Sequence, residues 1–437
     1  MPPWEWLSLH HAASVVTFAL TLMLVARVLR SDRPASGSAA WLLGIVLVPY
    51  VGIPLYLMLG NRKLRNVARK PALMLTRGVP AAGDNPVVWL DAPGPALQQF
   101  LDEIAAAQRT IHVSTFILGN DPAGRAIVLA LAARAAAGVE VCLLLDGLFA
   151  PRSPRDALAA LEAAGGRVAV FLPLIHLPWR GRSNVRNHRK VAVFDGERAI
   201  VGGMNLTDDC MGAQPRADRW RDLSIVVTRE AAAALAGVFR ADWAFASGRA
   251  VALVDNESRA AAIDVIPTGP DCAGDPWHDA VLQLIFDART RVLIATPYFA
   301  PDDSLRHALV IAARRGVAVT IVTPARSNHW ISDRVAGPML REVAAAGVTV
   351  MRYRPGMLHA KCLLIDDAIA AVGSANFNAR SLFLDFEVSL VLRGAEHNQR
   401  MAAWFAATLA DCEPGPPIAR GLRRPIEAVV RLLAPIA

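Results

Sequence analysis

The 437-residue chain is basic and apolar: its formal net charge is +8, hydrophobic residues make up 54% of it, and its mean hydropathy is +0.34. This hydropathy is high for a soluble protein and indicates membrane segments, while the charge favours an acidic partner such as anionic lipid or nucleic acid. Five scattered cysteines without CxxC or Cys/His spacing argue against a disulfide framework and against a zinc site.

Two uncharged runs near the N-terminus predict a transmembrane helical hairpin over residues 1–62. The runs Trp6–Ala26 and Ala40–Leu59 are long enough to cross a hydrocarbon core of roughly 30 Å as helices. A cleaved signal peptide is the alternative for the first run, but Glu5 and the lack of a basic n-region disfavour it. A buried soluble helix is the alternative for the second. More basic residues follow the second run than lie between the two, which favours a cytosolic C-terminal body.

Beyond the hairpin, a strand–helix–strand pattern occurs twice. Its three segments are residues 109–117, 124–137 and 139–145 in the first half, and 291–299, 304–315 and 317–322 in the second. The repeat predicts an α/β fold of two lobes with pseudo-twofold symmetry, each a β-sheet flanked by helices. We place the lobes at residues 63–262 and 263–437, with their junction near residues 254–267.

One short pattern is written once in each half. Residues 188–205 read His-Arg-Lys-Val-Ala-Val-Phe-Asp, then six residues, then Gly-Gly-Met-Asn. Residues 359–376 read His-Ala-Lys-Cys-Leu-Leu-Ile-Asp, then six residues, then Gly-Ser-Ala-Asn. Because His, Lys, Asp, Gly and Asn recur in identical register, chance is a poor explanation.

The duplicated histidine and lysine suit displacement at phosphorus. Side chains two apart on a strand share a face, so His188 projects with Lys190 and His359 with Lys361. One histidine can form a phosphoenzyme adduct while the other protonates the departing alkoxide. This scheme needs no metal and no cofactor.

The other motif residues are expected to support this chemistry. Asn205 and Asn376 are neutral donors for the non-bridging oxygens, and losing one such donor typically costs ~3 kcal/mol. Small residues that end the returning strands would let backbone N–H groups approach a phosphate. These are Gly202, Gly203, Gly373 and Ser374. Asp195 and Asp366 have the opposite strand parity and are interpreted as turn or scaffold residues.

Each catalytic histidine needs an acidic partner that fixes its tautomer. Asp222 and Glu387 follow the two motifs on comparable predicted strands, so we expect them to be these partners. His112 and His329 stand in no such pattern and are expected to be structural or exposed.

This constellation resembles the phospholipase D superfamily, and its setting is similar to that of bacterial cardiolipin synthases. Similar segments span nearly the whole chain; they are residues 40–56, 184–190, 202–205, 296–302, 373–387 and 422–435. One departure is Cys210, where an aromatic residue usually stands, which affects the expected acceptor site rather than the chemistry.

The resemblance implies a transphosphatidylation in the bacterial inner membrane. Phosphatidylglycerol gives its phosphatidyl group to a histidine and glycerol leaves; a second phosphatidylglycerol then attacks, giving cardiolipin. The family's pattern places a carboxylate at Asp222 and at Glu387, and makes His188 the nucleophile and His359 the acid/base. The expected partners are therefore anionic phospholipid and membrane, without nucleic acid.

Several alternatives remain open. A membrane-bound phospholipase D or another phosphatidyltransferase would keep every catalytic residue. A nuclease is disfavoured because the basic residues are not interleaved with base-stacking aromatics. A non-catalytic membrane scaffold would tolerate loss of one motif, yet both are complete. The amphipathic tail at residues 422–435 either lies on an anionic membrane or packs on the body as a helix.

Overall fold

The structure, a computed structural model, describes residues 3–30, 35–59, 86–173, 184–214, 216, 218–248 and 263–418. Two compact units make up the chain. The first is Met1–Arg62 with Leu174–Val185, and the second is Lys63–Pro173 with Arg186–Ala437. Both sheets belong to the second unit, so the lobes predicted from the repeat form one body. The tail at residues 422–435 lies outside the described residues.

The described residues of the first unit form three helices, α1 (Pro3–Leu29), α2 (Ala35–Leu47) and α3 (Pro49–Leu59). The expected single helix over residues 40–59 is therefore wrong, because Pro49 has no N–H with which to continue the α2 hydrogen bonds and begins a new helix instead. The helices α2 and α3 approach closely at two glycines: a Cβ on Gly52 would lie 2.1 Å from the carbonyl oxygen of Gly44. Among the described helices, none combines the length and the apolar character that a bilayer crossing requires.

The first lobe is built on a seven-stranded sheet of order β1-β7-β6-β5-β2-β3-β4. The strands are β1 (Val88–Leu90), β2 (Thr110–Thr115), β3 (Glu140–Asp146), β4 (Arg167–Phe171), β5 (Val191–Phe194), β6 (Arg198–Gly202) and β7 (Ser224–Thr228). The helices are α4 (Pro93–Ala106), α5 (Pro122–Ala136), α6 (Arg155–Ala163), α7 (Asp208–Met211) and α8 (Arg229–Ser247), with a short 3₁₀ turn, η1, at Ala150–Arg152.

The second lobe has an eight-stranded sheet of order β15-β11-β10-β9-β12-β13-β14-β8. The strands are β8 (Ile263–Thr268), β9 (Arg291–Ala295), β10 (Ala318–Pro324), β11 (Thr349–Tyr353), β12 (Cys362–Ile365), β13 (Ile369–Gly373), β14 (Glu387–Arg393) and β15 (Cys412–Pro414). The helices are α9 (Pro276–Asp287), α10 (Asp303–Arg314), α11 (Trp330–Ala345), α12 (Ala379–Phe383) and α13 (Ala395–Ala410).

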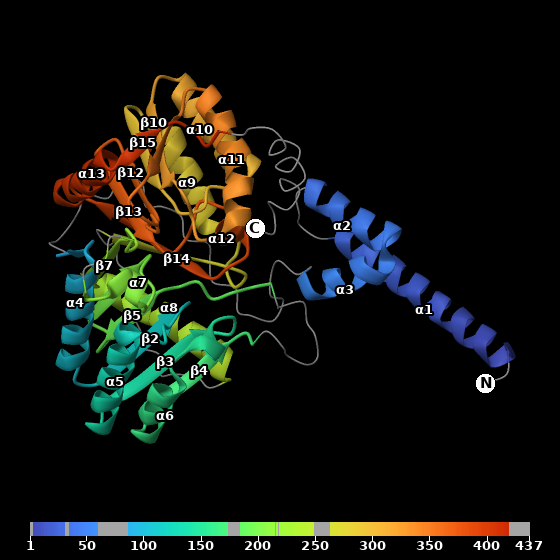
Figure 1. Cartoon of the computed structure of the whole chain (residues 1–437), viewed down its shortest axis with the longest axis horizontal. Coiled ribbons are helices and arrows are strands. Elements are labelled where there is room, and N and C mark those ends of the chain that lie inside the picture. Colours follow the sequence, from blue (N-terminus) through green and yellow to red (C-terminus); the bar gives the residue numbers. More distant parts are fainter. Residues whose placement is uncertain are drawn as a thin grey trace. The chain divides into compact units, whose positions relative to one another are not determined.

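The two sheets repeat the same strand order, which confirms the predicted two-lobed α/β fold (Figure 1). In the first, β2, β3 and β4 are parallel and β5, β6 and β7 run antiparallel beside them; β9 to β11 and β12 to β14 do the same in the second. The expected junction needs one correction. Residues 263–267 belong to β8, which pairs with β14 at the edge of the second sheet.

A shared apolar core joins the lobes. Buried residues of both sheets and of helices α8 and α13 form one cluster, with Val191 and Leu235 from the first lobe and Leu293, Trp404 and Phe405 from the second. Each lobe also buries a core of its own. The lobes are therefore fixed against each other by apolar packing, which allows a site to be assembled from both.

Strand direction determines where the two motifs lie. Val191 at the start of β5 pairs with Ser114 near the end of β2, and Cys362 at the start of β12 pairs with Ala295 at the end of β9. The residues that precede β5 and β12 therefore lie at the edges where the parallel strands end. Those edges carry residues 188–190 and 359–361.

Candidate active site

The approach to each motif is hydrogen-bonded to the other lobe. The backbone N–H of His188 donates to the carbonyl oxygen of Phe386 at 2.9 Å, and that of His359 donates to Arg221 at 2.7 Å. Phe386 and Arg221 each stand directly before one of the predicted acidic partners, Glu387 and Asp222. The two half-sites are therefore connected by main-chain bonds across the lobe interface.

The histidine–carboxylate pairs are crossed between the lobes. His188 Nδ1, from the first lobe, lies 2.9 Å from Glu387 Oε1 of the second. His359 Nδ1, from the second lobe, lies 2.5 Å from Asp222 Oδ2 of the first. All four side chains are buried. Neither lobe alone supplies a complete pair, so each imidazole is oriented only when the lobes are assembled.

The two motif lysines lie beside their histidines and are also buried. Lys190 Nζ donates to the carbonyl oxygen of His188 at 2.7 Å. Lys361 Nζ donates to the carbonyl oxygen of His359 and lies 3.0 Å from Nε2 of the same residue. The site thus concentrates two ammonium groups and two imidazoles in one buried region.

Burial sets the protonation of the crossed pairs. Loss of solvation lowers the pKa of His188 to about 4 and that of His359 to about 3, and the nearby lysines act in the same direction. Burial would raise the pKa values of Glu387 and Asp222, but the neighbouring imidazoles and ammonium groups outweigh it and hold both below their usual range. Near neutral pH each pair is therefore a neutral imidazole and a carboxylate. The Nδ1–H donates to the carboxylate, which leaves the lone pair on Nε2 to react.

The lowered pKa values of the two motif lysines predict that the site takes up protons when an anionic headgroup binds. Burial lowers the pKa of Lys190 to about 7 and that of Lys361 to about 8, so both are partly neutral in the free site at pH 8. A bound phosphodiester favours the ammonium forms and raises both pKa values. Affinity should therefore fall as the pH rises through this range, by up to about tenfold per pH unit for each proton taken up.

Calorimetric titration with a phosphonate analogue of phosphatidylglycerol, in buffers of different ionisation enthalpy, measures these protons. Lys361→Arg is the matched variant, because a guanidinium stays charged; it should take up fewer protons. Binding at pH 8 without net proton uptake would contradict the prediction.

The small residues at the strand ends make room for the neighbouring strands. A Cβ on Gly203 would lie 2.1 Å from Asp222 Oδ1, and one on Gly202 would lie 2.4 Å from the Cα of Ser224. A Cβ on Gly373 would lie 2.5 Å from the carbonyl oxygen of Val388. Close strand packing thus explains why glycine stands at all three positions. Contact of these residues with a phosphate stays a prediction.

Ser374, the fourth of these small residues, supports the first crossed pair. Its hydroxyl donates to Glu387 Oε2 at 2.5 Å, and its carbonyl oxygen lies 3.1 Å from His188 Nδ1. The corresponding position in the first motif is Gly203, which carries no hydroxyl. The two crossed pairs are therefore held differently: Glu387 receives a side-chain donor from its own lobe, which Asp222 does not receive from Gly203.

Asn205 and Asn376 are buried. Within the described part of the chain, neither side-chain oxygen has a hydrogen-bond partner. An unsatisfied buried amide oxygen is costly, and it calls for a functional explanation such as a ligand or water. The expected role of both amides toward a phosphate stays a prediction.

Asp195 and Asp366 lie in the turns that follow β5 and β12, at the strand ends remote from the histidines. Both have positive φ angles, 54° and 52°. The Asp195 carboxylate accepts backbone N–H groups of residues 108–110, and the Asp366 carboxylate those of residues 289–291. Each aspartate therefore anchors the chain at the start of the first parallel strand of its lobe, β2 or β9.

Arg189, which sequence analysis did not single out, is buried beneath the site. Its Nε donates to the carbonyl oxygen of Glu387 at 2.9 Å, and its other nitrogens donate to Asp242 and to the carbonyl oxygen of Thr268. This guanidinium connects the first motif to the strand that carries Glu387. The second motif has Ala360 at this position, so only the first motif makes this connection through a guanidinium.

We expect Arg189→Met to destabilise the body by roughly 3 kcal/mol, because it removes the cation that faces buried Asp242 while leaving the carboxylate in place. The exposed Arg216→Met, which loses an ion pair with Asp218, should cost less than about 1 kcal/mol. Thermal unfolding in detergent, followed by near-ultraviolet circular dichroism, measures both. Equal effects of the two substitutions would show that Arg189 does not fasten the lobes.

Aromatic rings border both histidines. The rings of Phe116 and His188 are 4.6 Å apart, and those of Trp220 and His359 are 4.8 Å apart. Cys210, the departure noted in the sequence, is fully buried with its Sγ 4.0 Å from Asp222 Oδ2. Burial raises the pKa of this thiol to about 12, so it remains a weak donor toward the carboxylate.

The remaining histidines and the possible metal ligands lie as follows. His112 is buried and stacked on Phe239, whereas His329 is exposed. Two groups of three possible ligands occur among the described residues: His112 with Glu140 and Cys142, and Cys210 with Asp222 and His359. Glu140 already pairs with Arg167 at 2.9 Å, and the second group contains a crossed pair. In both groups, therefore, the carboxylate already interacts with a side chain of the protein.

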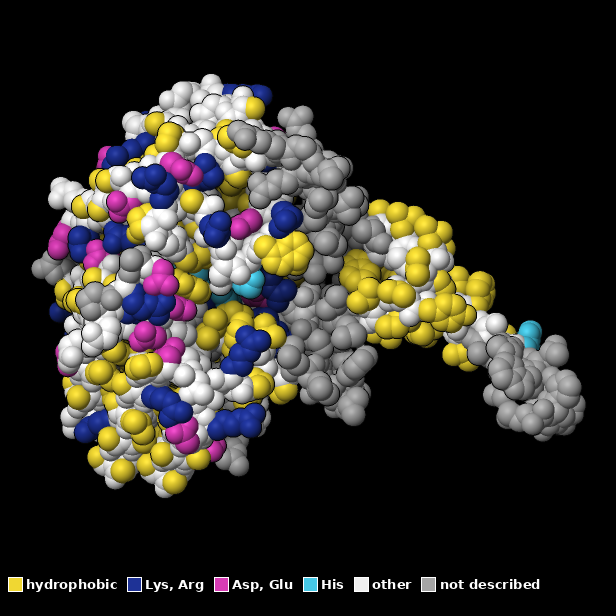
Figure 2. Space-filling view, in the orientation of Figure 1, with side chains coloured by type: hydrophobic (Ala, Val, Ile, Leu, Met, Phe, Trp, Pro, Cys, Tyr) yellow, Lys and Arg dark blue, Asp and Glu magenta, His cyan; other side chains and the backbone are white. Residues whose placement is uncertain are grey.

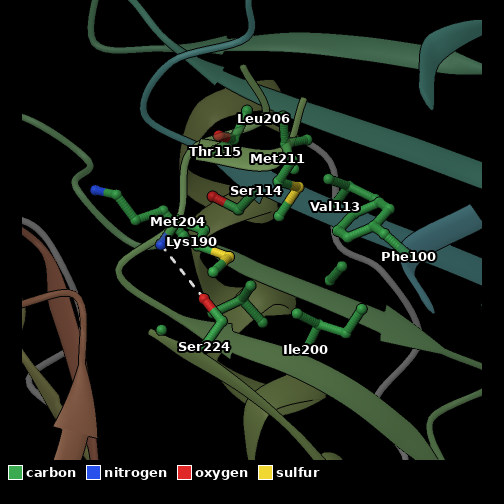
Figure 3. A pocket seen from close by; sticks show the side chains of 13 residues that line it. Phe100, Val113, Ser114, Thr115, Lys190, Ile200, Met204, Leu206, Met211 and Ser224 are labelled. Carbon is green, nitrogen blue, oxygen red and sulfur yellow. Dashed lines mark hydrogen bonds between the residues drawn. The ribbon is translucent and has the colours of Figure 1, made fainter. Parts of the chain in front are cut away.

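A small cavity of about 10 Å³ lies inside the first lobe, next to the site (Figure 3). Phe100, Met204 and Met211 line it together with the hydroxyl-bearing Ser224, which accepts the backbone N–H of Met204 at 3.3 Å. The side chain of Lys190 points away from it in Figure 3. This space holds about one water molecule, so it is too small for a lipid chain.

Comparison with known proteins agrees with this geometry. The family described as "Cardiolipin synthase, PLD-like domain" matches residues 100–243 and 281–409. The Major cardiolipin synthase ClsA of Bacillus subtilis is 30% identical, over 96% of this chain and 98% of that protein. The chain belongs to the phospholipase D-like cardiolipin synthase family. Cardiolipin synthase A of Pseudomonas aeruginosa is 31% identical, over 92% of this chain and 91% of that protein.

Other parts of the comparison concern the fold and the N-terminus. The crystal structure of phosphatidylserine synthase from Haemophilus influenzae matches with a TM-score of 0.62, covering 80% of this chain and 93% of that one. Its sequence identity is 16%, so this likeness shows the fold. The family described as "Phospholipase_D-nuclease N-terminal" matches residues 19–61, which include the C-terminal part of α1 and all of α2 and α3.

Proposed function

We propose that this family member is a phosphatidyltransferase that makes cardiolipin and glycerol from two molecules of phosphatidylglycerol. The observation that carries the proposal is the pair of imidazoles, each held at Nδ1 by a carboxylate of the other lobe, with a lysine beside each. Two such groups are what a double displacement at phosphorus requires. The family relatives, named as cardiolipin synthases, support this substrate class.

In the first step, His188 Nε2 attacks phosphorus and the bond from phosphorus to the glycerol oxygen breaks. His359, protonated once the anionic phosphodiester lies beside it, gives its proton to the departing glycerol. The product is a phosphatidyl group on His188 and a neutral His359. Lys190 and Lys361 stabilise the negative charge on the non-bridging oxygens.

In the second step, His359 takes the proton from the terminal hydroxyl of a second phosphatidylglycerol. That oxygen attacks phosphorus, the bond to His188 Nε2 breaks, and cardiolipin leaves. Protons and bonds then balance over the cycle. Asn205 and Asn376 are proposed to donate to the same non-bridging oxygens, because their buried amides adjoin both motifs.

The same proposal extends to location. The apolar N-terminal segment would hold the enzyme in the bacterial inner membrane as a hairpin, with the body on the cytosolic side. The match of residues 19–61 to an N-terminal family and the membrane-derived substrate support membrane association. The basic residues after residue 60 favour the cytosolic side.

The test is incubation of the reconstituted full chain with phosphatidylglycerol, without added metal, followed by lipid chromatography. Cardiolipin and glycerol in equal amounts are expected. Phosphatidic acid as the sole product would replace the proposal with a hydrolase, because water would then be the acceptor. An unchanged lipid together with rapid DNA cleavage would replace it with a nuclease.

A further inference from the structure

The loops that follow β3 and β10 occupy equivalent positions in the two lobes. Each strand is the second of three parallel strands, so each loop begins at the sheet edge that carries the histidines. We name two segments the rim loops: residues 148–152, which include η1, and residues 329–334, which run from the end of the second loop into the first turns of α11. The same kinds of side chain recur in both.

The rim loop of the first lobe combines apolar and basic side chains. Leu148 is 39% exposed, and the guanidinium of Arg152 lies 5.5 Å from the centre of the Phe149 ring. The Phe149 ring is 4.9 Å from Phe116, whose ring in turn contacts His188. An unbroken row of aromatic rings therefore leads from this loop to the catalytic imidazole.

The rim loop of the second lobe repeats the combination. Trp330 is 63% exposed and Ile331 is 40% exposed, and the guanidinium of Arg334 lies 4.8 Å from the centre of the Trp330 ring. The loop is held to the strand edge through Tyr298, whose hydroxyl donates to Asn328 at 2.6 Å. Tyr298 also stacks edge-on against His329. The exposed Trp330 thus stands at the first residue of α11, next to this contact.

We propose that the two rim loops form a docking surface for an anionic lipid bilayer, through which the substrate headgroup reaches the site. This inference rests on the proposed function, because a lipid substrate must pass from a bilayer to buried histidines. Figure 2 shows hydrophobic and basic side chains side by side around the recess between the lobes in which histidine atoms are visible.

The chemistry of the rim loops fits an anionic bilayer surface. Tryptophan is amphipathic and favours the interface between headgroups and chains. An arginine stacked on an aromatic ring keeps its charge at the level of the headgroups while its stem covers apolar surface. A basic residue near an anionic leaflet is attracted to its negative surface potential. The second rim loop also contains one acidic residue, Asp333. Its carboxylate accepts a hydrogen bond from the backbone N–H of Ser327 at 3.3 Å.

Two further exposed apolar residues of the second lobe provide a contrast. Phe286 at the end of α9 is 46% exposed and Ile311 on α10 is 44% exposed, close to the values for the rim loops. Phe286 precedes β9, so it lies at the sheet edge opposite the histidines. Such isolated apolar side chains are normal on a protein surface. They serve as matched controls.

The first test compares two ways of presenting phosphatidylglycerol to the full chain. The double variant Leu148→Ser with Trp330→Ser, reconstituted in vesicles, is assayed on bilayer phosphatidylglycerol and on a dispersed short-chain form. The ratio of bilayer to dispersed turnover should fall about tenfold, since two interfacial anchors are lost. Phe286→Ser should leave the ratio unchanged. An unchanged ratio in the double variant would overturn the proposal.

The second test measures contact directly and does not depend on catalysis. An environment-sensitive fluorophore is attached at Ile331→Cys or at Ile311→Cys, in a Cys412→Ser background because the other native cysteines are buried. In nanodiscs of anionic phosphatidylglycerol, emission from position 331 should shift to the blue relative to zwitterionic discs, and high salt should reduce the shift. Position 311 should show no shift. Equal emission at position 331 in both lipids would refute the docking surface, leaving a protein partner to be sought for this patch.

The two outcomes separate the inference from the function. A blue shift without cardiolipin formation would disprove the synthase while the docking surface stands. Cardiolipin formation with neither a ratio change nor a blue shift would support the synthase and disprove the docking surface.

Discussion

Replacing His188 by asparagine should reduce cardiolipin formation by about 10⁴-fold or more, because a catalytic nucleophile acts as a unit with its partners and has no substitute. The same variant should form no covalent phosphatidyl-enzyme. His359→Asn should also lose turnover, yet it keeps the nucleophile and can still form the adduct, more slowly because no acid protonates the departing glycerol. The measurement is rapid quenching with radiolabelled phosphatidylglycerol, followed by detection of acid-labile label on the protein.

The exposed His307→Asn is the matched control, since it makes the same chemical change on α10 away from the site. It should retain both turnover and adduct. A labelled adduct that survives in His188→Asn would reverse the assignment of the two histidines. The double variant His188→Asn with His359→Asn should be hardly worse than His188→Asn alone, because without the nucleophile there is no adduct on which His359 could act.

The sequence predicts the two lobes because their repeat is periodic and local. Alternating apolar segments of strand and helix length fix β2, α5 and β3 to within a few residues, and the same holds for their counterparts in the second half. The motif spacing predicts which residues are catalytic candidates, since strand parity and turn chemistry depend only on neighbours along the chain. These features require no knowledge of how the lobes pack.

The crossing of the carboxylates could not be predicted in this way. From the sequence, Asp222 follows His188 and Glu387 follows His359, so the natural interpretation pairs residues of one lobe. The exchange arises because strands of both lobes meet at one interface, where the chain before each histidine bonds to the chain before the other lobe's carboxylate. Such a contact depends on lobe docking, which leaves no periodic trace in the sequence.

Arg189 was missed for a related reason. A single arginine between the histidine and the lysine of the motif has the pattern of an exposed strand residue, whereas the structure buries it against Asp242, Thr268 and Glu387. Its partners come from α8, β8 and β14, far apart in the chain. The contrast with Ala360 in the second motif was the available signal: a repeat that departs from itself at one buried position points to a local task.

Crossed pairing makes a kinetic prediction that same-lobe pairing does not. Glu387→Gln should impair His188, and Asp222→Asn should impair His359, although each substitution lies in the lobe opposite to the histidine that it affects. An amide in place of the carboxylate favours the wrong imidazole tautomer and removes a charge, which lowers turnover by roughly 10²- to 10⁴-fold. Both changes preserve side-chain shape, so the fold should persist.

A phosphodiester with a nitrophenyl leaving group distinguishes the two defects. Nitrophenolate departs without a proton, so adduct formation then depends on His188 and Glu387, while breakdown of the adduct still needs His359 to take a proton from the acceptor. Asp222→Asn should therefore release a full burst of nitrophenolate and turn over slowly afterwards. Glu387→Gln should show a slow burst.

The opposite result, with the burst lost in Asp222→Asn and retained in Glu387→Gln, would mean that the carboxylates serve the histidines of their own lobes or that the histidine roles are exchanged. His188→Asn decides between these two possibilities, because it abolishes the burst only if His188 is the nucleophile. Loss of the burst in His188→Asn and Glu387→Gln together, with the burst kept in Asp222→Asn, can arise only if the nucleophile of one lobe is activated by the carboxylate of the other. In that case a separated lobe would carry a nucleophile without its activating carboxylate, and the assembled pair of lobes would be the smallest unit able to form the adduct.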